Sequence, residues 1–202
     1  EKKSNLTFGN VYKNQYMERV DKIYIPKVNF LKEVINKPLN ILDYGCGAGH
    51  FVYALELKKY KAYGFEINEN VKKLVPKKIK KKIFYSGNLI EVINSNKINC
   101  LSLINVLEHL DNPNRILSDF KKSNAKYLYI SVPLFSFSVL IEHIFQNVFP
   151  KQLGGAHTHL YTEKSLNFLF KKLKLKILGE WWFGTDIADL MRSFIVQNKF
   201  YD

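Results

Sequence analysis

Short apolar runs alternate with helix-length segments along most of the chain. The runs cover residues 40–43, 62–66, 83–85, 100–105, 127–132, 175–178 and 194–196. Strands that alternate with helices predict a parallel sheet with helices on both faces, and therefore an α/β fold. The last two runs have no good helix between them, so we expect them to form an antiparallel, hairpin-like end of the sheet.

Two other segments have helical character. Residues 1–36 precede the first strand and are expected to form one or two helices of the same domain. Between residues 137 and 149, apolar side chains recur at helical spacing along one stripe. The simpler interpretation is a helix packed on the core, and the alternative is a lid over a site for an apolar or lipid-linked substrate.

The composition fits one globular domain. The chain has 202 residues, of which 47% are hydrophobic, and this excludes intrinsic disorder. Two cysteines exclude a disulfide scaffold and a cysteine-cluster zinc site. The longest uncharged stretch, residues 127–141, is too short to span a bilayer, so no transmembrane helix is expected. The chain opens without a signal-peptide pattern, which favours the cytoplasm, and its first residue, Glu1, leaves open a missing N-terminal part.

The clearest chemical signal is a glycine-rich loop after the first strand. That strand ends in Asp43, and the chain then passes through Gly45, Gly47 and Gly49 into a helix. Glycines allow a sharp turn and a close approach of the backbone to a ligand, and the helix N-terminus offers free N–H groups to a carboxylate or phosphate. A dinucleotide site would need glycine at the position of His50. The acid beside the loop favours a ligand that carries an amine or another positive group.

An acid at the end of the second strand completes this signal. Glu66 ends the run 62–66, where a carboxylate is placed to accept both hydroxyls of a ribose. The expected ligand then has a ribose, a carboxylate and a cation, and S-adenosylmethionine has all three.

Five motifs in order resemble the class I S-adenosylmethionine-dependent methyltransferases, in the branch related to ubiquinone-biosynthesis enzymes. Besides Glu66, they are Asp43-x-Gly45-Cys46-Gly47-x-Gly49, Val106-Leu107-Glu108-His109-Leu110, Ile130-Ser131-Val132-Pro133 and His159-Leu160-Tyr161-Thr162-x-x-Ser165-Leu166. The resemblance implies a Rossmann-like sheet of seven strands with one antiparallel strand. It also implies a methyltransferase domain over residues 37–202, with residues 1–36 covering the cofactor or acceptor. The residues that we expect at the cofactor are Asp43, Gly45, Cys46, Gly47, Gly49, Glu66, Ile67, Asn88, Leu89, Asn105, Val106 and His109.

The chain departs from the family pattern at two positions. Asn88 stands where relatives have an acid near the adenine amine, and its side-chain oxygen is expected to accept from that amine. Some relatives bind a divalent metal through Glu-x-x-Glu-His, but here the first acid is Asn105. Glu108 and His109 alone are a thin ligand set for a hard cation, so no metal is expected.

Candidate catalytic residues follow the fifth strand. His157 and His159 come after Gly154 and Gly155, on a loop expected to reach the acceptor side of the sheet. Histidine is the commonest side-chain base near neutral pH, so we expect one of the pair to be the base, with His157 slightly ahead. Tyr161 is a candidate for holding the acceptor, and the simpler alternative is that both histidines are structural.

The resemblance implies methyl transfer to a small molecule in the cytoplasm. The expected acceptor is a hydroxyl of a sugar, nucleotide-sugar, lipid-linked sugar or phenolic compound, as in polysaccharide biosynthesis. The net charge of +13 suits a phosphate-bearing acceptor and leaves peripheral membrane contact open. Only three of the 31 basic residues are arginines, so a nucleic-acid partner is not expected. The oligomeric state is left open.

Two alternatives remain. An RNA methyltransferase is supported by a dense lysine run between residues 72 and 82, which also fits a solvated loop in a lysine-biased protein. The Asn/Asp-Pro-Pro-Tyr element that acts on exocyclic base amines is absent after the fourth strand. A non-catalytic cofactor-binding subunit is the other alternative, and the intact glycine loop argues against it.

Overall fold

The computed structural model describes residues 14–137, 139–140 and 157–183. The chain divides into two compact units. The first unit comprises residues 1–104 and 116–130, and the second comprises residues 105–115 and 131–202. The N-terminal helices thus belong to the same unit as most of the sheet.

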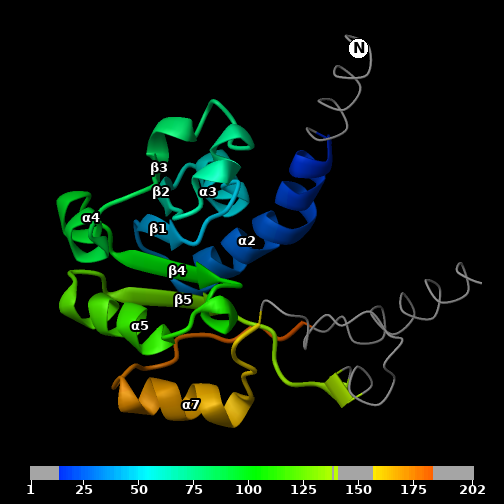
Figure 1. The fold of residues 1–202 in the computed structure, drawn as a ribbon, viewed down its shortest axis with the longest axis vertical. Helices are drawn as coiled ribbons and strands as arrows, with labels where there is room; N and C mark the ends of the chain where they lie inside the picture. The colour runs from blue at the N-terminus through cyan, green and yellow to red at the C-terminus, as the bar shows by residue number, and fades with distance from the viewer. Residues whose placement is uncertain (1–13, 138, 141–156, 184–202) are drawn as a thin grey trace, which may run out of the picture. The chain divides into compact units, whose positions relative to one another are not determined.

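The sheet has five strands in the order β3-β2-β1-β4-β5 (Figure 1). They are β1 (Asn40–Tyr44), β2 (Lys61–Phe65), β3 (Ile83–Phe84), β4 (Cys100–Ile104) and β5 (Tyr127–Ser131). β1 pairs in parallel with β2 and with β4, and β2 pairs in parallel with β3. The first five predicted runs are therefore confirmed as the strands of an α/β, Rossmann-like sheet.

The predicted antiparallel end of the sheet is not seen in the described residues. Residues 175–178 form no strand there, and the run at 194–196 lies outside the described part of the chain. A strand depends on a hydrogen-bonded neighbour. Ile177 and Leu178 are 43% and 55% exposed, so their apolar side chains are not packed as they would be in a completed sheet.

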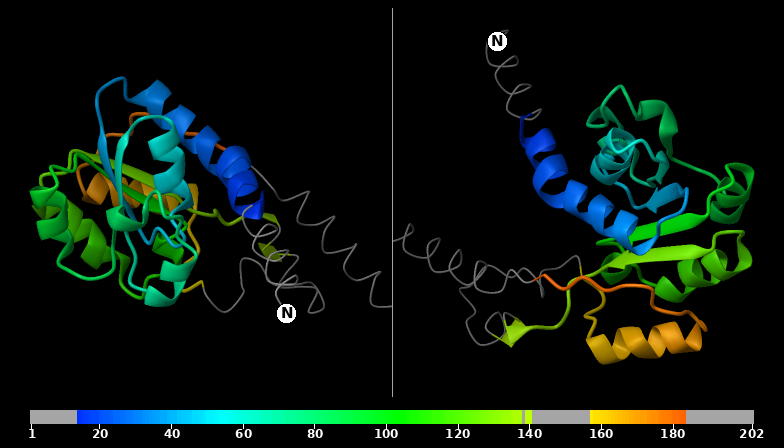
Figure 2. Two further views of the ribbon diagram at one scale, coloured as in Figure 1. Left: turned by 90° about the horizontal axis from the view of Figure 1, so that it is seen from above. Right: turned by 180° about the vertical axis from the view of Figure 1, so that it is seen from behind.

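Helices cover both faces of the sheet. Residues 14–19 are helical and continue into η1 (Val20–Tyr24) and α2 (Ile25–Val34) before β1. The helices between strands are α3 (His50–Leu57), α4 (Leu89–Ser95) and α5 (Pro113–Lys122). Because the strand order reverses between β1 and β4, right-handed crossovers place α3 on one face and α4 and α5 on the other (Figure 2). None of the helices in the described residues is long and apolar enough to cross a bilayer.

The core of the first unit lies where the central strands meet α3 and α2. All five residues of β4 are buried, as are the middle three of β1. On α3 the buried side chains are Phe51, Val52, Ala54 and Leu55, which recur at helical spacing. The ligand site of such a sheet lies at the carboxyl ends of the strands where the order reverses, which here means β1 and β4.

Gly64 on β2 allows the loop after β1 to pack against the sheet. A Cβ atom at Gly64 would lie 2.5 Å from Cys46 Sγ and 2.6 Å from Ile83 Cδ1. Both neighbours are buried, so neither can move without disturbing the core.

We therefore expect Gly64→Ala to lower the free energy of unfolding by about 1–3 kcal/mol, as overpacking does. Urea unfolding measures this change. In a Cys46→Ala background one of the two clashes is removed, so the cost of Gly64→Ala should shrink. Equal stability of Gly64→Ala and wild type would show that the loop does not pack against β2 in this way.

Candidate functional site

The loop that follows β1 is built on three left-handed glycines. The φ angles of Gly45, Gly47 and Gly49 are 69°, 53° and 78°, a region that costs other residues about 1–2 kcal/mol. Gly45 N–H donates to the Phe65 carbonyl at 2.8 Å, which ties the loop to the end of β2. A Cβ atom at Gly49 would lie 2.6 Å from Ile79 Cδ1, whereas at Gly47 nothing lies within 4 Å. The space over Gly47 is therefore open to a ligand.

Glu66 links the end of β2 to this loop. Its Oε2 accepts from Gly47 N–H at 2.8 Å, and its Oε1 accepts from Asn68 N–H at 2.8 Å. The residue is only 8% exposed, yet each oxygen has a further lone pair for a ligand hydroxyl. The structure thus brings Glu66 and the glycine loop together as predicted. Ile67 follows it with 75% exposure, an apolar surface beside the carboxylate.

Asp43 is a buried acid beneath the loop. It is 4% exposed, and its Oδ1 accepts from Ser102 Oγ at 2.7 Å. Burial raises the pKa of Asp43 to about 7, the nearby Glu66 charge adds to the rise, and the Ser102 hydrogen bond opposes it. Sequence reasoning missed Ser102, although a lone polar residue in the apolar strand β4 was a usable signal.

An aromatic sandwich holds the start of α3. The ring of His50 stacks on Tyr16, with centroids 4.1 Å apart, and on Tyr24, with centroids 5.5 Å apart. Tyr16 Oη also donates to the Ala48 carbonyl at 3.2 Å. Burial, followed by the Arg19 charge, lowers the pKa of His50 to about 4, so the ring is neutral at pH 7. Sequence reasoning did not foresee this attachment of the N-terminal helix to the loop.

Asn88 acts as the N-cap of α4. Its Oδ1 accepts from Ile90 N–H at 2.9 Å and from Glu91 N–H at 3.3 Å. These two bonds engage the side-chain oxygen that the sequence analysis assigned to the adenine amine. Asn88 therefore offers only its side-chain N–H groups to a ligand. The next residue, Leu89, is buried at 8% exposure.

The second unit begins directly after β4. Asn105 has a φ of 53°, a left-handed conformation that asparagine tolerates better than most residues, and its N–H donates to the Ser131 carbonyl at 2.8 Å. Val106 is buried at 6% exposure, and η4 spans Leu107–His109. The left-handed backbone conformation thus explains why asparagine suits this position.

Glu108, His109 and His157 form a cluster in the second unit. One possible ligand atom of each lies within 4.8 Å of the others, and the two imidazole centroids are 4.7 Å apart. Glu108 is 1% exposed, and its Oε2 is buried without a hydrogen-bond partner. Burial raises the pKa of Glu108, and the charges of His109 and His157 oppose the rise. The sequence-based expectation of no metal counted two donors here, and the fold brings His157 beside them as a third.

His159 has a different environment from His157. Its Nδ1 lies 2.9 Å from Thr158 Oγ1, which lies 3.1 Å and 3.0 Å from the carbonyl oxygens of Glu108 and Leu110. Threonine has a single hydroxyl hydrogen, and the carbonyls can only accept it. The Thr158 hydroxyl and His159 Nδ1 are therefore hydrogen-bonded in a direction that depends on the tautomer of the imidazole.

Tyr161 is an anchor within the second unit. It is 8% exposed, and its hydroxyl donates to the Leu107 carbonyl at 3.4 Å. Its own carbonyl accepts from Phe135 N–H at 2.7 Å. After it, Thr162 caps α7 (Glu163–Lys172) in a capping box with Ser165. The Tyr161 side chain is thus engaged by the loop itself.

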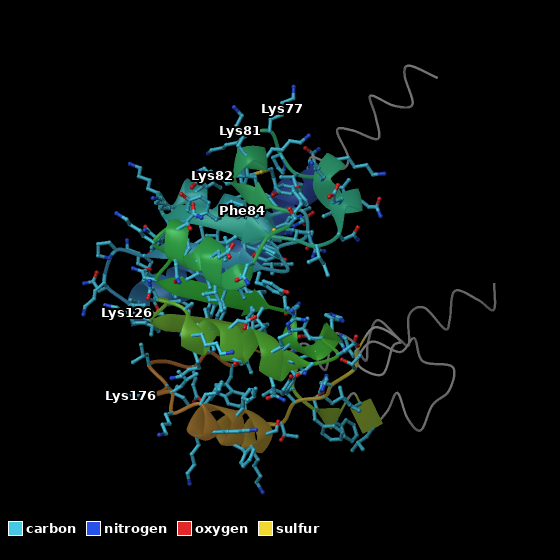
Figure 3. The ribbon with its side chains drawn as sticks, turned by 60° about the vertical axis from the view of Figure 1, so that its left-hand side comes forward. Lys77, Lys81, Lys82, Phe84, Lys126 and Lys176 are labelled. Atoms are coloured by element: carbon cyan, nitrogen blue, oxygen red, sulfur yellow. The ribbon has the colours of Figure 1, made fainter. Side chains whose placement is uncertain are left out.

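Several lysines of the basic run have partners within the first unit. Lys82 pairs with Glu56 at 2.6 Å, and Lys72 and Lys78 lie over the rings of Tyr85 and Tyr53. Lys77 and Lys81 project outward from the ribbon (Figure 3). Ile79, in the middle of the run, is fully buried beside Gly49, so this segment also covers the glycine loop.

The two cysteines lie buried in the first unit. Burial is the largest cause that raises the pKa of both thiols, to about 12 for Cys100. Neither sulfur is a nucleophile at neutral pH. Cys46 therefore fills space in the loop.

The raised pKa of Asp43 makes stability depend on pH in a definite direction. The ordinary pKa is 3.8, so between about pH 4 and about pH 7 the folded protein keeps a proton that the unfolded chain has lost. The free energy of unfolding should fall by up to ~1.4 kcal/mol per pH unit across that window and then level off. In urea unfolding, the free energy of unfolding of Asp43→Asn should not fall across this pH window. Wild-type and Asp43→Asn curves that stay parallel from pH 5 to pH 8 would contradict the shift.

Several solved structures share the fold. The magnesium protoporphyrin IX methyltransferase from Synechocystis PCC 6803, with bound SAH, has a TM-score of 0.57 at 16% identity, over 77% of this chain and 71% of that chain. A SAM-dependent methyltransferase from Archaeoglobus fulgidus has a TM-score of 0.52 at 17% identity, over 86% and 85%. One from Aquifex aeolicus has 0.53 at 19% identity, over 80% and 84%. At these identities the likeness shows the fold. No curated protein matches the chain.

The family model described as a methyltransferase domain matches residues 16–179. That stretch includes the glycine loop, Glu66, the Glu108–His109 segment and the loop with His157 and His159. The resemblance on these motifs is confirmed at the level of the family, and the ubiquinone-biosynthesis branch stays a prediction. The chain belongs to the methyltransferase domain family.

Proposed function

We propose that this protein transfers the methyl group of S-adenosylmethionine to a small-molecule acceptor. The observation that carries the proposal is the Glu66 carboxylate, which is bonded to Gly47 N–H and Asn68 N–H beside an open glycine loop. A buried acid with spare lone pairs suits the two hydroxyls of a ribose. A ligand with a pyrophosphate would be repelled by this acid and by Asp43.

The residues around the loop fit the remaining parts of this cofactor. The open space over Gly47 admits a closely approaching ligand, and a side chain there would fill it. Asp43 and Glu66 are two buried acids, and a ligand with ammonium and sulfonium charges compensates them. Ile67 offers an exposed apolar surface to an adenine ring. When bound, the cofactor supplies an electrophilic methyl group on sulfur, and the protein must orient the acceptor along the axis of that bond.

His159 is the base of the proposed reaction. Its Nδ1 lies 2.9 Å from Thr158 Oγ1, which orients the ring. In the tautomer with the hydrogen on Nδ1, the Nε2 atom takes a proton from an acceptor hydroxyl. The sequence placed His157 slightly ahead, but His157 lies against His109 and Glu108. Tyr161 then positions the loop through Leu107 rather than holding the acceptor. Loops after parallel strands surround the ligand in sheets of this type, which supports an acceptor site near these residues.

The acceptor that we favour is a hydroxyl of a sugar, nucleotide-sugar, lipid-linked sugar or phenolic compound. The net charge of +13 suits a phosphate-bearing acceptor, as in polysaccharide biosynthesis in the cytoplasm. A separate part of the proposal concerns the fold: two further strands would complete a seven-stranded sheet with one antiparallel strand. The lysine run supports an RNA methyltransferase less than its composition suggests. Three of its lysines have partners within the protein: Lys72, Lys78 and Lys82.

The first test is cofactor affinity. Titration calorimetry with S-adenosylhomocysteine should show one site on the wild-type protein. Glu66→Ala should weaken binding by about 1–3 kcal/mol, the scale for lost bonds to a charged group. Glu69→Ala, at an exposed acid three residues away, should bind as wild type does. Glu66 also holds the loop, so the loss of binding must be separated from a loss of folding. Glu66→Gln keeps the shape of the side chain, and thermal unfolding of each variant shows whether it is folded. A wild-type protein indifferent to the cofactor would end the methyltransferase proposal.

The second test is the base. Transfer from methyl-labelled S-adenosylmethionine is measured on a panel of sugar, nucleotide-sugar and phenolic acceptors. His159→Ala should lower turnover about 10²–10⁴-fold, the usual contribution of a general base, with cofactor affinity nearly unchanged. Thr158→Val should lower turnover less, because the imidazole stays but loses the hydrogen bond that orients it. Near-wild-type turnover of His159→Ala together with a loss in His157→Ala would return the role to His157.

A further inference from the structure

The Tyr85 hydroxyl is a buried donor to which the described residues offer no hydrogen-bond partner. Tyr85 comes directly after β3, and its ring packs against the core of the first unit. Burial of an O–H group without an acceptor opposes folding, so such groups are rare in folded proteins. The fold alone therefore gives this hydroxyl no role, whereas a ligand that accepts from it would.

Tyr85 lies at the same junction of strands and loop as Glu66. The carbonyl of Phe84, one residue before Tyr85, accepts from Glu66 N–H at 2.9 Å. The Tyr85 ring also packs against a core cluster that includes Cys46 of the glycine loop. Burial is the largest cause that raises the pKa of Tyr85, followed by the charges of nearby groups, Glu66 among them. The phenol therefore stays protonated at neutral pH and is a donor close to the acid that we assign to the cofactor.

The chemistry of Glu66 and Tyr85 together favours a hydroxyl as the group that they bind. Each Glu66 oxygen already accepts one backbone N–H and has a lone pair left for a further donor. A ligand hydroxyl can donate its hydrogen to that lone pair and still accept from the Tyr85 O–H, whereas an ammonium group has no lone pair to offer. A ribose carries two such hydroxyls, which are the groups that the proposed function assigns to Glu66.

The surroundings of the Tyr85 ring allow it to adjust to a ligand. No hydrogen bond to the described residues fixes its hydroxyl, and the side chain is only partly buried. The ammonium of Lys72 lies over the ring, 5.0 Å from its centroid. Lys72 is exposed, and its four-carbon chain is flexible. The ring can therefore turn its hydroxyl toward a ligand by displacing a flexible surface side chain.

We propose that the Tyr85 hydroxyl donates a hydrogen bond to a ribose hydroxyl of the bound cofactor, the same hydroxyl that donates to Glu66. This inference rests on the proposed function and adds a residue that determines the specificity of its cofactor site. Glu66 alone accepts from any donor, but Glu66 and Tyr85 together require a group that donates and accepts at one oxygen atom. Tyr85 thereby favours a ribose over a deoxyribose at that position.

The experiment compares wild type with Tyr85→Phe, which removes only the hydroxyl. Titration calorimetry of the full chain uses S-adenosylhomocysteine and its 2′-deoxy and 3′-deoxy analogues. Tyr85→Phe should weaken binding of S-adenosylhomocysteine by about 5–10-fold, the scale of one hydrogen bond. For the analogue that lacks the shared hydroxyl, the two proteins should bind with equal affinity. In urea unfolding without ligand, Tyr85→Phe should be at least as stable as wild type, because the lost hydroxyl had no partner.

Tyr60→Phe is the matched control. Tyr60 directly precedes β2, at the opposite end of that strand from Glu66, so loss of its hydroxyl should leave the affinity for S-adenosylhomocysteine unchanged. The proposal is overturned if Tyr85→Phe binds S-adenosylhomocysteine as wild type does, if its loss of affinity persists with both deoxy analogues, or if it is less stable than wild type. A wild-type protein that binds no S-adenosylhomocysteine would instead overturn the proposed function itself, so the two failures are distinguishable.

Discussion

The rest of the first unit depends on the two hydrogen bonds that the Glu66 carboxylate accepts. They join the end of β2 to the loop that follows β1, through Gly47 N–H at 2.8 Å, and to its own strand end, through Asn68 N–H at 2.8 Å. The Phe65 carbonyl reinforces the same junction by accepting from Gly45 N–H. Because glycine is conformationally free, these bonds help to hold Gly45, Gly47 and Gly49 in their left-handed conformations. Ligand recognition and loop geometry are thus carried by the same carboxylate.

This arrangement concentrates acidic groups at the carboxyl ends of β1 and β2, within a strongly basic chain. Asp43 and Glu66 are both buried, and the charge of Glu66 disfavours the ionised form of Asp43 in a medium of low dielectric constant. Ser102 compensates Asp43 only in part. The protein therefore stores an unfavourable electrostatic term that a cationic ligand relieves. In the second unit Glu108 stores a similar term beside two imidazoles.

Patterns in the sequence predicted those parts of the fold that depend on residues close together in the chain. The five parallel strands and the loop with Gly45, Gly47 and Gly49 follow from apolar runs and turn chemistry. The strand expected at residues 175–178 depends on a partner, 194–196, that lies outside the described residues. The convergence of His157 on Glu108 joins segments about 50 residues apart, and no spacing rule reports it. Asn88 was assigned to the ligand from its position in the family pattern, and that pattern does not report the capping bonds to Ile90 and Glu91 that engage its side-chain oxygen.

The central claim is that the cofactor lies on the glycine loop and is recognised by Glu66. Backbone amide chemical shifts followed by NMR during titration with S-adenosylhomocysteine test it most directly. The account predicts the largest shifts at Gly45, Gly47 and Gly49 and at Glu66 to Asn68, with saturation at one molecule per chain. Saturable binding whose largest shifts lie elsewhere in the chain, with the glycine amides unmoved, would contradict it.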